Sequence, residues 1–62
     1  MEKEQIKAIK DAHTANKKEV KSLRKYYEEE NLEEDTAYEE GYNDALEFVM
    51  DTLGIKYKPL ND

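Results

Sequence analysis

The sequence predicts an all-α fold, an antiparallel helical hairpin with an extended C-terminal tail that dimerises into a four-helix bundle. Three observations indicate this fold: apolar residues recur at spacings of three and four over two long segments, an acidic stretch separates the segments, and a glycine and then a proline follow the second one. With 62 residues, one histidine and no cysteine, the chain is expected to form a single domain without disulfide bonds, metal sites or other cofactors.

The first helix is expected over residues 3–30, because no glycine or proline interrupts residues 1–40. Steps of three and four residues mark one stripe that is apolar at both ends and polar in the middle. The histidine in this stripe is expected to meet Asn16 or its own symmetry mate, since it lacks companions for catalysis or metal binding. We call the stripe the seam of the hairpin or dimer; on the first helix it comprises Ile6, Ile9, His13, Asn16, Val20, Leu23 and Tyr27.

A break is expected at residues 31–35, followed by a second helix over residues 36–53. Thr36 is a good N-cap, and Glu39 follows it at the spacing of a capping box. The alternative is one long helix that is only kinked here. The second helix carries a broad apolar face, from which Tyr42, Leu46 and Val49 are assigned to the seam.

The end of the second helix is the clearest local signal. Gly54 is suited to the left-handed conformation after the last turn, Ile55 supplies the apolar contact that often follows, and Pro59 prevents the helix from resuming. Residues 54–62 are therefore expected to form an extended tail.

Gly41 interrupts the second helix at a cost of about 1 kcal/mol relative to alanine. Our first interpretation is a close approach of the first helix to the missing side chain. The alternatives are a dent that receives a partner's side chain, or a helix that begins only after Gly41.

The unequal helix lengths predict a dimer. A first helix about 42 Å long and a second about 27 Å long leave about 15 Å of the first uncovered. Ile6 and Ile9 are expected on this overhang, where the tail or a second copy must cover them. We therefore expect a homodimer.

Charge is segregated along the chain. Residues 1–25 contain eight basic and four acidic side chains, whereas residues 26–62 contain twelve acidic and two basic ones. One interpretation is pairing between a basic and an acidic helix, which would fix their antiparallel register. Another is that the acidic surface occupies a nucleic-acid-binding groove of another protein as a DNA mimic. Direct binding of nucleic acid through residues 17–25 is less well supported, because the net charge is −6 and no known reader motif occurs.

The stretch "YYEEENLEEDTAYEE", residues 26–40, holds eight carboxylates, three tyrosines and no base. We expect it to contain the contacts with a larger protein partner, plausibly a nucleic-acid-handling enzyme, with tyrosines as rigid anchors. The candidate contact residues are Glu28, Glu29, Glu30, Glu33, Glu34, Asp35, Glu39, Glu40, Tyr26 and Tyr38.

The short motifs "GYNDAL" and "LGI" within residues 37–55 resemble segments of small uncharacterised accessory proteins of phages and prophages of low-GC Gram-positive bacteria. The resemblance implies a phage-encoded accessory protein that would act in the host cell cytoplasm. It attaches no defined activity and no catalytic residues.

Enzymatic activity is not expected. The only serine, Ser22, has no acid and histidine at a suitable spacing, and no glycine-rich phosphate loop occurs. The longest apolar run, residues 48–50, is too short for a membrane span or a signal-peptide core. The sequence therefore predicts a cytoplasmic, non-enzymatic protein-binding regulator or inhibitor, with a structural coiled-coil element as the alternative.

Overall fold

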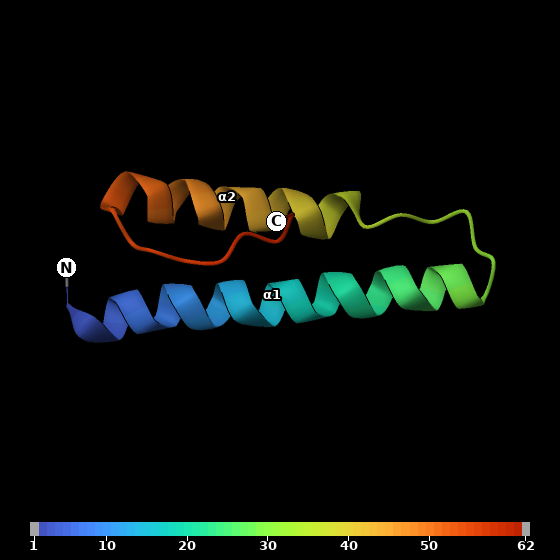
Figure 1. The fold of residues 1–62 in the computed structure, drawn as a ribbon, viewed down its shortest axis with the longest axis horizontal. Coiled ribbons are helices and arrows are strands. Elements are labelled where there is room, and N and C mark those ends of the chain that lie inside the picture. The colour runs from blue at the N-terminus through green and yellow to red at the C-terminus, as the bar shows by residue number, and fades with distance from the viewer. Residues whose placement is uncertain (1, 62) are drawn as a thin grey trace.

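Two helices packed antiparallel make up most of the computed structural model, which describes residues 2–61 (Figure 1). They are α1 (Lys3–Glu29) and α2 (Ala37–Leu53), and no strand occurs within the described residues. The predicted all-α hairpin is thereby confirmed. Over residues 2–61, neither helix is both long enough and apolar enough to cross a bilayer.

The end of α2 follows from Gly54, as its sequence predicts. Gly54 adopts the left-handed conformation with φ 72° and ψ 23°. The Ile55 amide then donates a hydrogen bond of 2.9 Å to the carbonyl of Met50, which satisfies a carbonyl that the helix end would leave unpaired. The sequence predicts this helix end correctly because all the groups that form it lie within residues 50–55.

The start of α2 differs from the expectation. Thr36 is the N-cap residue, but its side chain makes no capping hydrogen bond and donates instead to Glu40 Oε2 at 2.6 Å. Asp35 Oδ1 accepts from the Ala37 amide at 3.1 Å. The predicted capping box between Thr36 and Glu39 is therefore wrong, because the hydroxyl finds a carboxylate one residue further along.

A linker of residues 30–36 joins the helices, which excludes the single bent helix. Asn31 ends α1 with a positive φ of 54°, a conformation that asparagine tolerates better than most side chains. The linker then runs beside the last turns of α1 (Figure 1). As a consequence, α2 packs against the N-terminal part of α1, and His13 faces Glu47.

The expected overhang lies at the other end of the hairpin. The C-terminal end of α2 reaches close to the beginning of α1, whereas the last turns of α1 lie beside the linker (Figure 1). Ile6 and Ile9 are half-buried, so placing them on an overhang is wrong. The physical reason is that the extended linker spans more length per residue than helix does.

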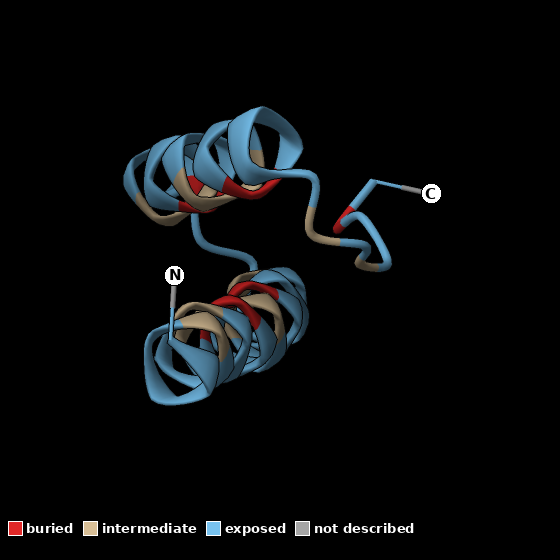
Figure 2. Ribbon diagram, turned by 90° about the vertical axis from the view of Figure 1, so that its left-hand side faces the viewer, coloured by how far each residue is buried: buried red, intermediate tan, exposed pale blue. Residues whose placement is uncertain are grey.

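The tail folds back along α2 and lies on one side of the helix pair (Figure 2). Lys17 Nζ on α1 donates a hydrogen bond of 2.8 Å to the carbonyl of Lys58. Leu60 is buried and joins Val20 and Met50, which are the other two buried apolar residues. The described core is thus built from α1, α2 and the tail together.

The side of α2 that faces α1 differs from the expected one, so α2 is rotated about its axis relative to our prediction. Asn43 and Met50 are buried, at 1% and 0% exposure, whereas Tyr42 and Val49 are 52% and 39% exposed. Our expectation that Tyr42 and Val49 pack between the helices of one chain is therefore wrong; their role in a dimer stays a prediction. Leu46 is half-buried.

On α1 the seam lies toward α2 and the tail, with its centre more deeply buried than its ends. His13, Asn16 and Val20 are buried, and the flanking seam residues are half-buried. These flanking residues are Ile6, Ile9, Leu23 and Tyr27.

Gly41 faces solvent in the interior of α2. A Cβ atom built on it has no atom within 4 Å apart from its own helix backbone and chain neighbours. The close approach expected at this residue is therefore wrong, and so is a helix that begins after it, because α2 begins at Ala37. The third interpretation, in which Gly41 leaves a dent that receives a partner's side chain, stays a prediction.

We predict that Gly41→Ala stabilises the protein by about 1 kcal/mol, because alanine is the better helix former and no neighbour obstructs its methyl group. Chemical denaturation followed by circular dichroism measures the change. Gly54→Ala is the matched control and should destabilise by about 1–2 kcal/mol, since a side chain disfavours its left-handed backbone. Destabilisation by Gly41→Ala would contradict the open position described here.

Candidate functional site

The acidic end of the molecule consists of six exposed carboxylates that lie where α1 passes into the linker. Two of them belong to the last turn of α1, and the other four lie in the linker, so the change of direction after α1 gathers them at one end of the hairpin (Figure 1). We define the acidic end as Glu28, Glu29, Glu30, Glu33, Glu34 and Asp35.

These carboxylates have almost no basic partners. Among residues 2–61, the acidic end makes one ion pair, between Glu29 and Lys25 at 3.8 Å, and both side chains are largely exposed. Three glutamates also sit at the C-terminal end of α1, where no basic residue occupies the last turn. The helix dipole disfavours negative charge there, so this arrangement lowers the local stability of α1 rather than raising it.

The charge pairing between helices that the sequence suggested is limited. Arg24 pairs with Glu40 at 2.8 Å, and this is the only Lys or Arg ion pair between α1 and α2 within residues 2–61. The remaining pairs of this type join residues four apart on α1. Register therefore depends on other contacts.

A concave surface of about 480 Å³ lies beside the acidic end. Glu40 is held there by Thr36 Oγ1 at 2.6 Å and by Arg24 at 2.8 Å. The Thr36 hydrogen bond is the main cause that lowers the pKa of Glu40; burial opposes the shift and Arg24 adds to it. Glu40, a predicted contact residue, is thus engaged inside the chain and less available than the acidic end.

Exposed aromatic side chains lie close to these carboxylates. Tyr38 is 88% exposed, and Tyr26 and Leu32 are also exposed. The rings of Tyr26 and Tyr27 lie 5.9 Å apart. Burial, followed by the charges of nearby acids, raises the pKa of Tyr27 above its ordinary value.

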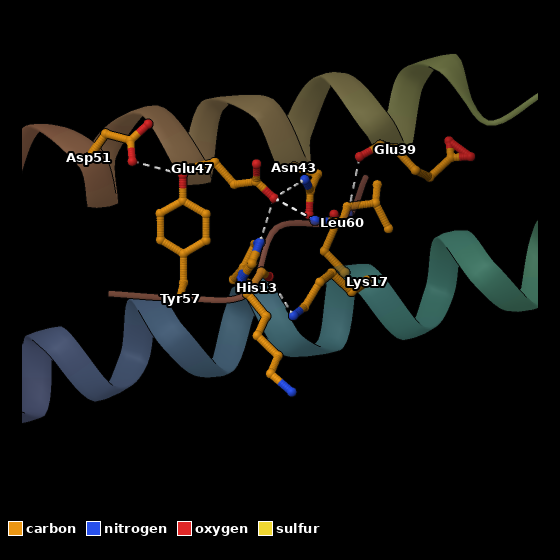
Figure 3. Close-up of polar contacts among 10 residues, drawn as sticks. His13, Lys17, Glu39, Asn43, Glu47, Asp51, Tyr57 and Leu60 are labelled. Carbon is orange, nitrogen blue, oxygen red and sulfur yellow. Dashed lines mark hydrogen bonds and ion pairs between the residues drawn. The ribbon is translucent and has the colours of Figure 1, made fainter. Parts of the chain in front are cut away.

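A second polar cluster lies inside the hairpin, and its centre is Glu47 (Figure 3). Glu47 Oε2 lies 2.8 Å from His13 Nε2, 2.7 Å from Asn43 Nδ2 and 2.9 Å from the Leu60 amide. Because an ionised carboxylate only accepts hydrogen bonds, His13 carries a proton on Nε2. One oxygen therefore joins α1, α2 and the tail.

Burial acts to raise the pKa of Glu47, but the hydrogen bonds from His13, the Leu60 amide and Asn43 outweigh it and leave this pKa below its ordinary value. His13 is buried, and its partner is Glu47 of the same chain, whereas we expected Asn16 or its own symmetry mate. This buried arrangement is suited to holding the tail in place.

Tyr57 fastens the same part of the tail. Its ring meets the edge of His13 with centroids 5.3 Å apart, and its hydroxyl donates to Asp51 Oδ1 at 2.8 Å. The hydrogen bond to Asp51, with burial and nearby negative charge, raises the pKa of Tyr57 to about 12. Tyr57 therefore remains a donor at ordinary pH.

The sequence reading missed Glu47 and Asn43. On a helical projection Glu47 lies off the apolar stripe of α2, whereas Asn43 shares a side with Met50 seven residues later but is polar, so neither stands out as an apolar seam residue. The available signal was the polar middle of the α1 stripe, at His13 and Asn16, which requires polar partners once buried. Within residues 2–61, no group of three or more histidine, cysteine or acidic residues is placed to hold a metal ion.

The basic stretch 17–25 is partly engaged within the chain. Lys17 binds the tail carbonyl of Lys58, Arg24 binds Glu40, and Lys25 lies near Glu29. These contacts reduce the number of cations that are free to follow a phosphate backbone.

We predict that Glu47→Gln lowers the free energy of unfolding at neutral pH by about 1–3 kcal/mol, because buried donors lose an ionised acceptor. The wild-type contribution is present above the ordinary Glu pKa of 4.5 and is lost as pH falls through the lowered folded value. The variant should therefore lose part of this acid dependence. Denaturation between neutral and acidic pH measures both effects.

Glu33→Gln is the matched control, since it removes the same charge from an exposed position. It should leave stability and its acid dependence close to those of the wild type. Equal behaviour of the two variants would contradict the role given to Glu47.

Comparison of the chain with protein-family models, curated protein sequences and solved structures found no match. The geometry of the acidic end and of the Glu47 cluster is therefore the basis for the function proposed next.

Proposed function

We propose that the chain is a non-enzymatic regulator or inhibitor that docks on a larger protein through the acidic end. The observation that carries the proposal is the set of six exposed carboxylates, of which only Glu29 has a basic side chain within ion-pair distance among residues 2–61. Such a surface is complementary to a cationic groove and repels nucleic acid.

The local cost of this arrangement supports a binding role. Acids at the C-terminal end of α1 oppose the helix dipole, and stability alone would favour lysine or arginine there. Residues that break a local rule without a compensating contact in the fold are expected at functional sites. A basic partner supplies the missing compensation.

Aromatic side chains near the acidic end complete the docking surface. Tyr26 and Tyr38 are exposed, and tyrosine combines a large rigid contact area with a hydrogen-bonding hydroxyl. Carboxylates would steer the approach to the partner, and the tyrosines would anchor the complex once water is excluded.

The partner class that suits this chemistry is a nucleic-acid-handling enzyme, whose phosphate-binding groove would accept the acidic end as a DNA mimic. The resemblance of residues 37–55 to phage accessory proteins is consistent with an inhibitor of a host or defence enzyme in the host cytoplasm. A basic stretch that is partly engaged within the chain gives direct nucleic-acid binding less support.

The alternative function is a structural element that assembles with copies of itself, in the form of a four-helix bundle. The observation in its favour is the exposed apolar side of α2, where Tyr42, Val49 and Leu53 are only partly covered. This alternative assigns no role to the acidic end.

We predict that replacing Glu29, Glu30, Glu33 and Glu34 by lysine abolishes partner capture, because the charge complementarity is reversed. Tagged protein is incubated with lysate of a low-GC Gram-positive bacterium at low and at high salt, and bound proteins are identified by mass spectrometry. The wild type should capture a basic nucleic-acid-handling enzyme at low salt and lose it at high salt or on addition of duplex DNA.

The matched control replaces Glu2, Glu4, Asp11 and Asp44 by lysine, which gives the same net charge from exposed positions outside the acidic end. This control should still capture the enzyme. Loss of capture in both variants would mean that net charge, and not the position of the carboxylates, determines binding. Capture that persists at high salt and with duplex DNA would contradict docking through the acidic end.

A further inference from the structure

One part of the apolar face of α2 is open to solvent, although Met50 is buried and Leu46 is half-buried. At about 100° per residue, Tyr42, Val49 and Leu53 share one side of the helix, and all three are exposed or partly exposed. Asn43 and Glu47 lie on the other side and make the interior hydrogen bonds. Part of the apolar stripe of α2 is thus left outside the core.

The tail covers only one side of the helix pair (Figure 2). Lys17 and Glu47 mark the covered side, since both bind tail backbone. The helical repeat places a second set of small and apolar residues on the opposite side, which we call the open face. It comprises Leu23, Tyr42, Ala45, Leu46, Val49 and Leu53, all exposed or half-buried.

The open face is hollowed between the two helices. A depression of about 440 Å³ is lined by Asn16 and Glu19 of α1 and by Tyr38, Glu39 and Tyr42 of α2. Asn16 is 5% exposed, and its Oδ1 is a buried acceptor without a partner in the described structure. Asn16 Nδ2 donates to the carbonyl of Glu39 at 3.2 Å, so the hollow itself is the observation that this face is not filled by the single chain.

We propose that a second copy of the chain docks on the open face and forms an antiparallel dimer in which α2 packs against α2 of the other copy. The molecule measures 43 × 18 × 17 Å. These extents bound the area of the long face at roughly 750 Å² per copy, below the ~800 Å² per partner of a standard interface, so we expect a weak dimer in equilibrium with its monomer. The pair of hairpins then makes the four-helix bundle, with each tail on the outside.

The charge distribution selects the antiparallel orientation. A parallel dimer would bring two acidic ends, with six carboxylates each, to the same end of the bundle. The antiparallel dimer separates them along a molecule 43 Å long, well beyond the Debye length of about 10 Å at 0.1 M salt. It also brings the end that holds Lys3, Lys7 and Lys10 toward the other copy's acidic end.

This orientation fixes a register. A two-fold axis across the helices passes between Ala45 and Leu46, at the middle of α2. Tyr42 of one copy then meets Val49 of the other, and the hollow beside Tyr42 receives that apolar side chain. Ala45 lies beside this axis and close to its own symmetry mate, where its small side chain allows close approach.

The dimer is tested by sedimentation equilibrium of the full chain over about a hundredfold range of concentration. Wild type should show a monomer–dimer equilibrium, and Val49→Glu should weaken it at least about tenfold, because a charge is placed in the interface. Phe48→Glu is the matched control: Phe48 is 71% exposed on the same helix but outside the open face, so its dimer should persist.

The orientation is tested by oxidation of single-cysteine variants, since the chain has no cysteine of its own. Ala45→Cys should form a disulfide-linked dimer readily, and Phe48→Cys should not. Circular dichroism of each variant establishes that the helices are retained.

A monomeric wild type at every concentration would overturn the proposal and leave the open face to a different protein. Equal weakening by the Val49 and Phe48 substitutions, or a dimer without the Ala45→Cys crosslink, would overturn the stated face or orientation. The proposal does not depend on the acidic end, so the charge-reversal experiment can fail while the dimer remains.

Discussion

One carboxylate oxygen holds the three parts of this chain together. Glu47 Oε2 accepts hydrogen bonds from His13 on α1, from Asn43 on α2 and from the Leu60 amide in the tail. With three buried apolar residues in the described core, hydrophobic burial alone gives little directional information, whereas a buried acceptor is costly unless its donors are in place. The positions of α2 and of the tail therefore follow from the same contact.

Placing Glu47 inside determines what α2 presents outside. The inner side of α2 combines Asn43 with Met50, and Tyr42 and Val49, which lie about 100° away around the helix, are left exposed. The tail then covers the groove between the helices on the side of Glu47 (Figures 2 and 3) and leaves the opposite side open. The interior cluster and the open face are two consequences of one rotation.

The acidic end lies apart from the Glu47 cluster and the open face, and it does not depend on the same contacts. Its carboxylates are exposed and largely unpaired, so they contribute little to the fold and disfavour the end of α1. In the antiparallel dimer that we propose, the two acidic ends would lie at opposite ends of the bundle. A dimer of this form would present two copies of the proposed docking surface, which increases avidity for a partner with repeated basic sites.

The sequence by itself determined the two helices, the break between them and the end of α2. Each depends on groups close in the chain: the spacing of apolar residues, the tolerance of Asn31 for a positive φ, and the left-handed Gly54. The concentration of carboxylates at one end also followed directly from their order in the chain. Only the tertiary structure decided the rotation of α2, the return of the tail and the position of the overhang.

Those features depend on pairs far apart in sequence, such as His13 with Glu47 and Lys17 with Lys58. The spacing of apolar residues predicts which residues share a side of a helix. It does not predict which side is buried when polar and apolar residues could both enter a small core. In this chain Asn43 and Glu47 make the interior hydrogen bonds of α2, Met50 is buried, and Tyr42 and Val49 stay exposed. That arrangement is decided only once the helices and the tail are brought together.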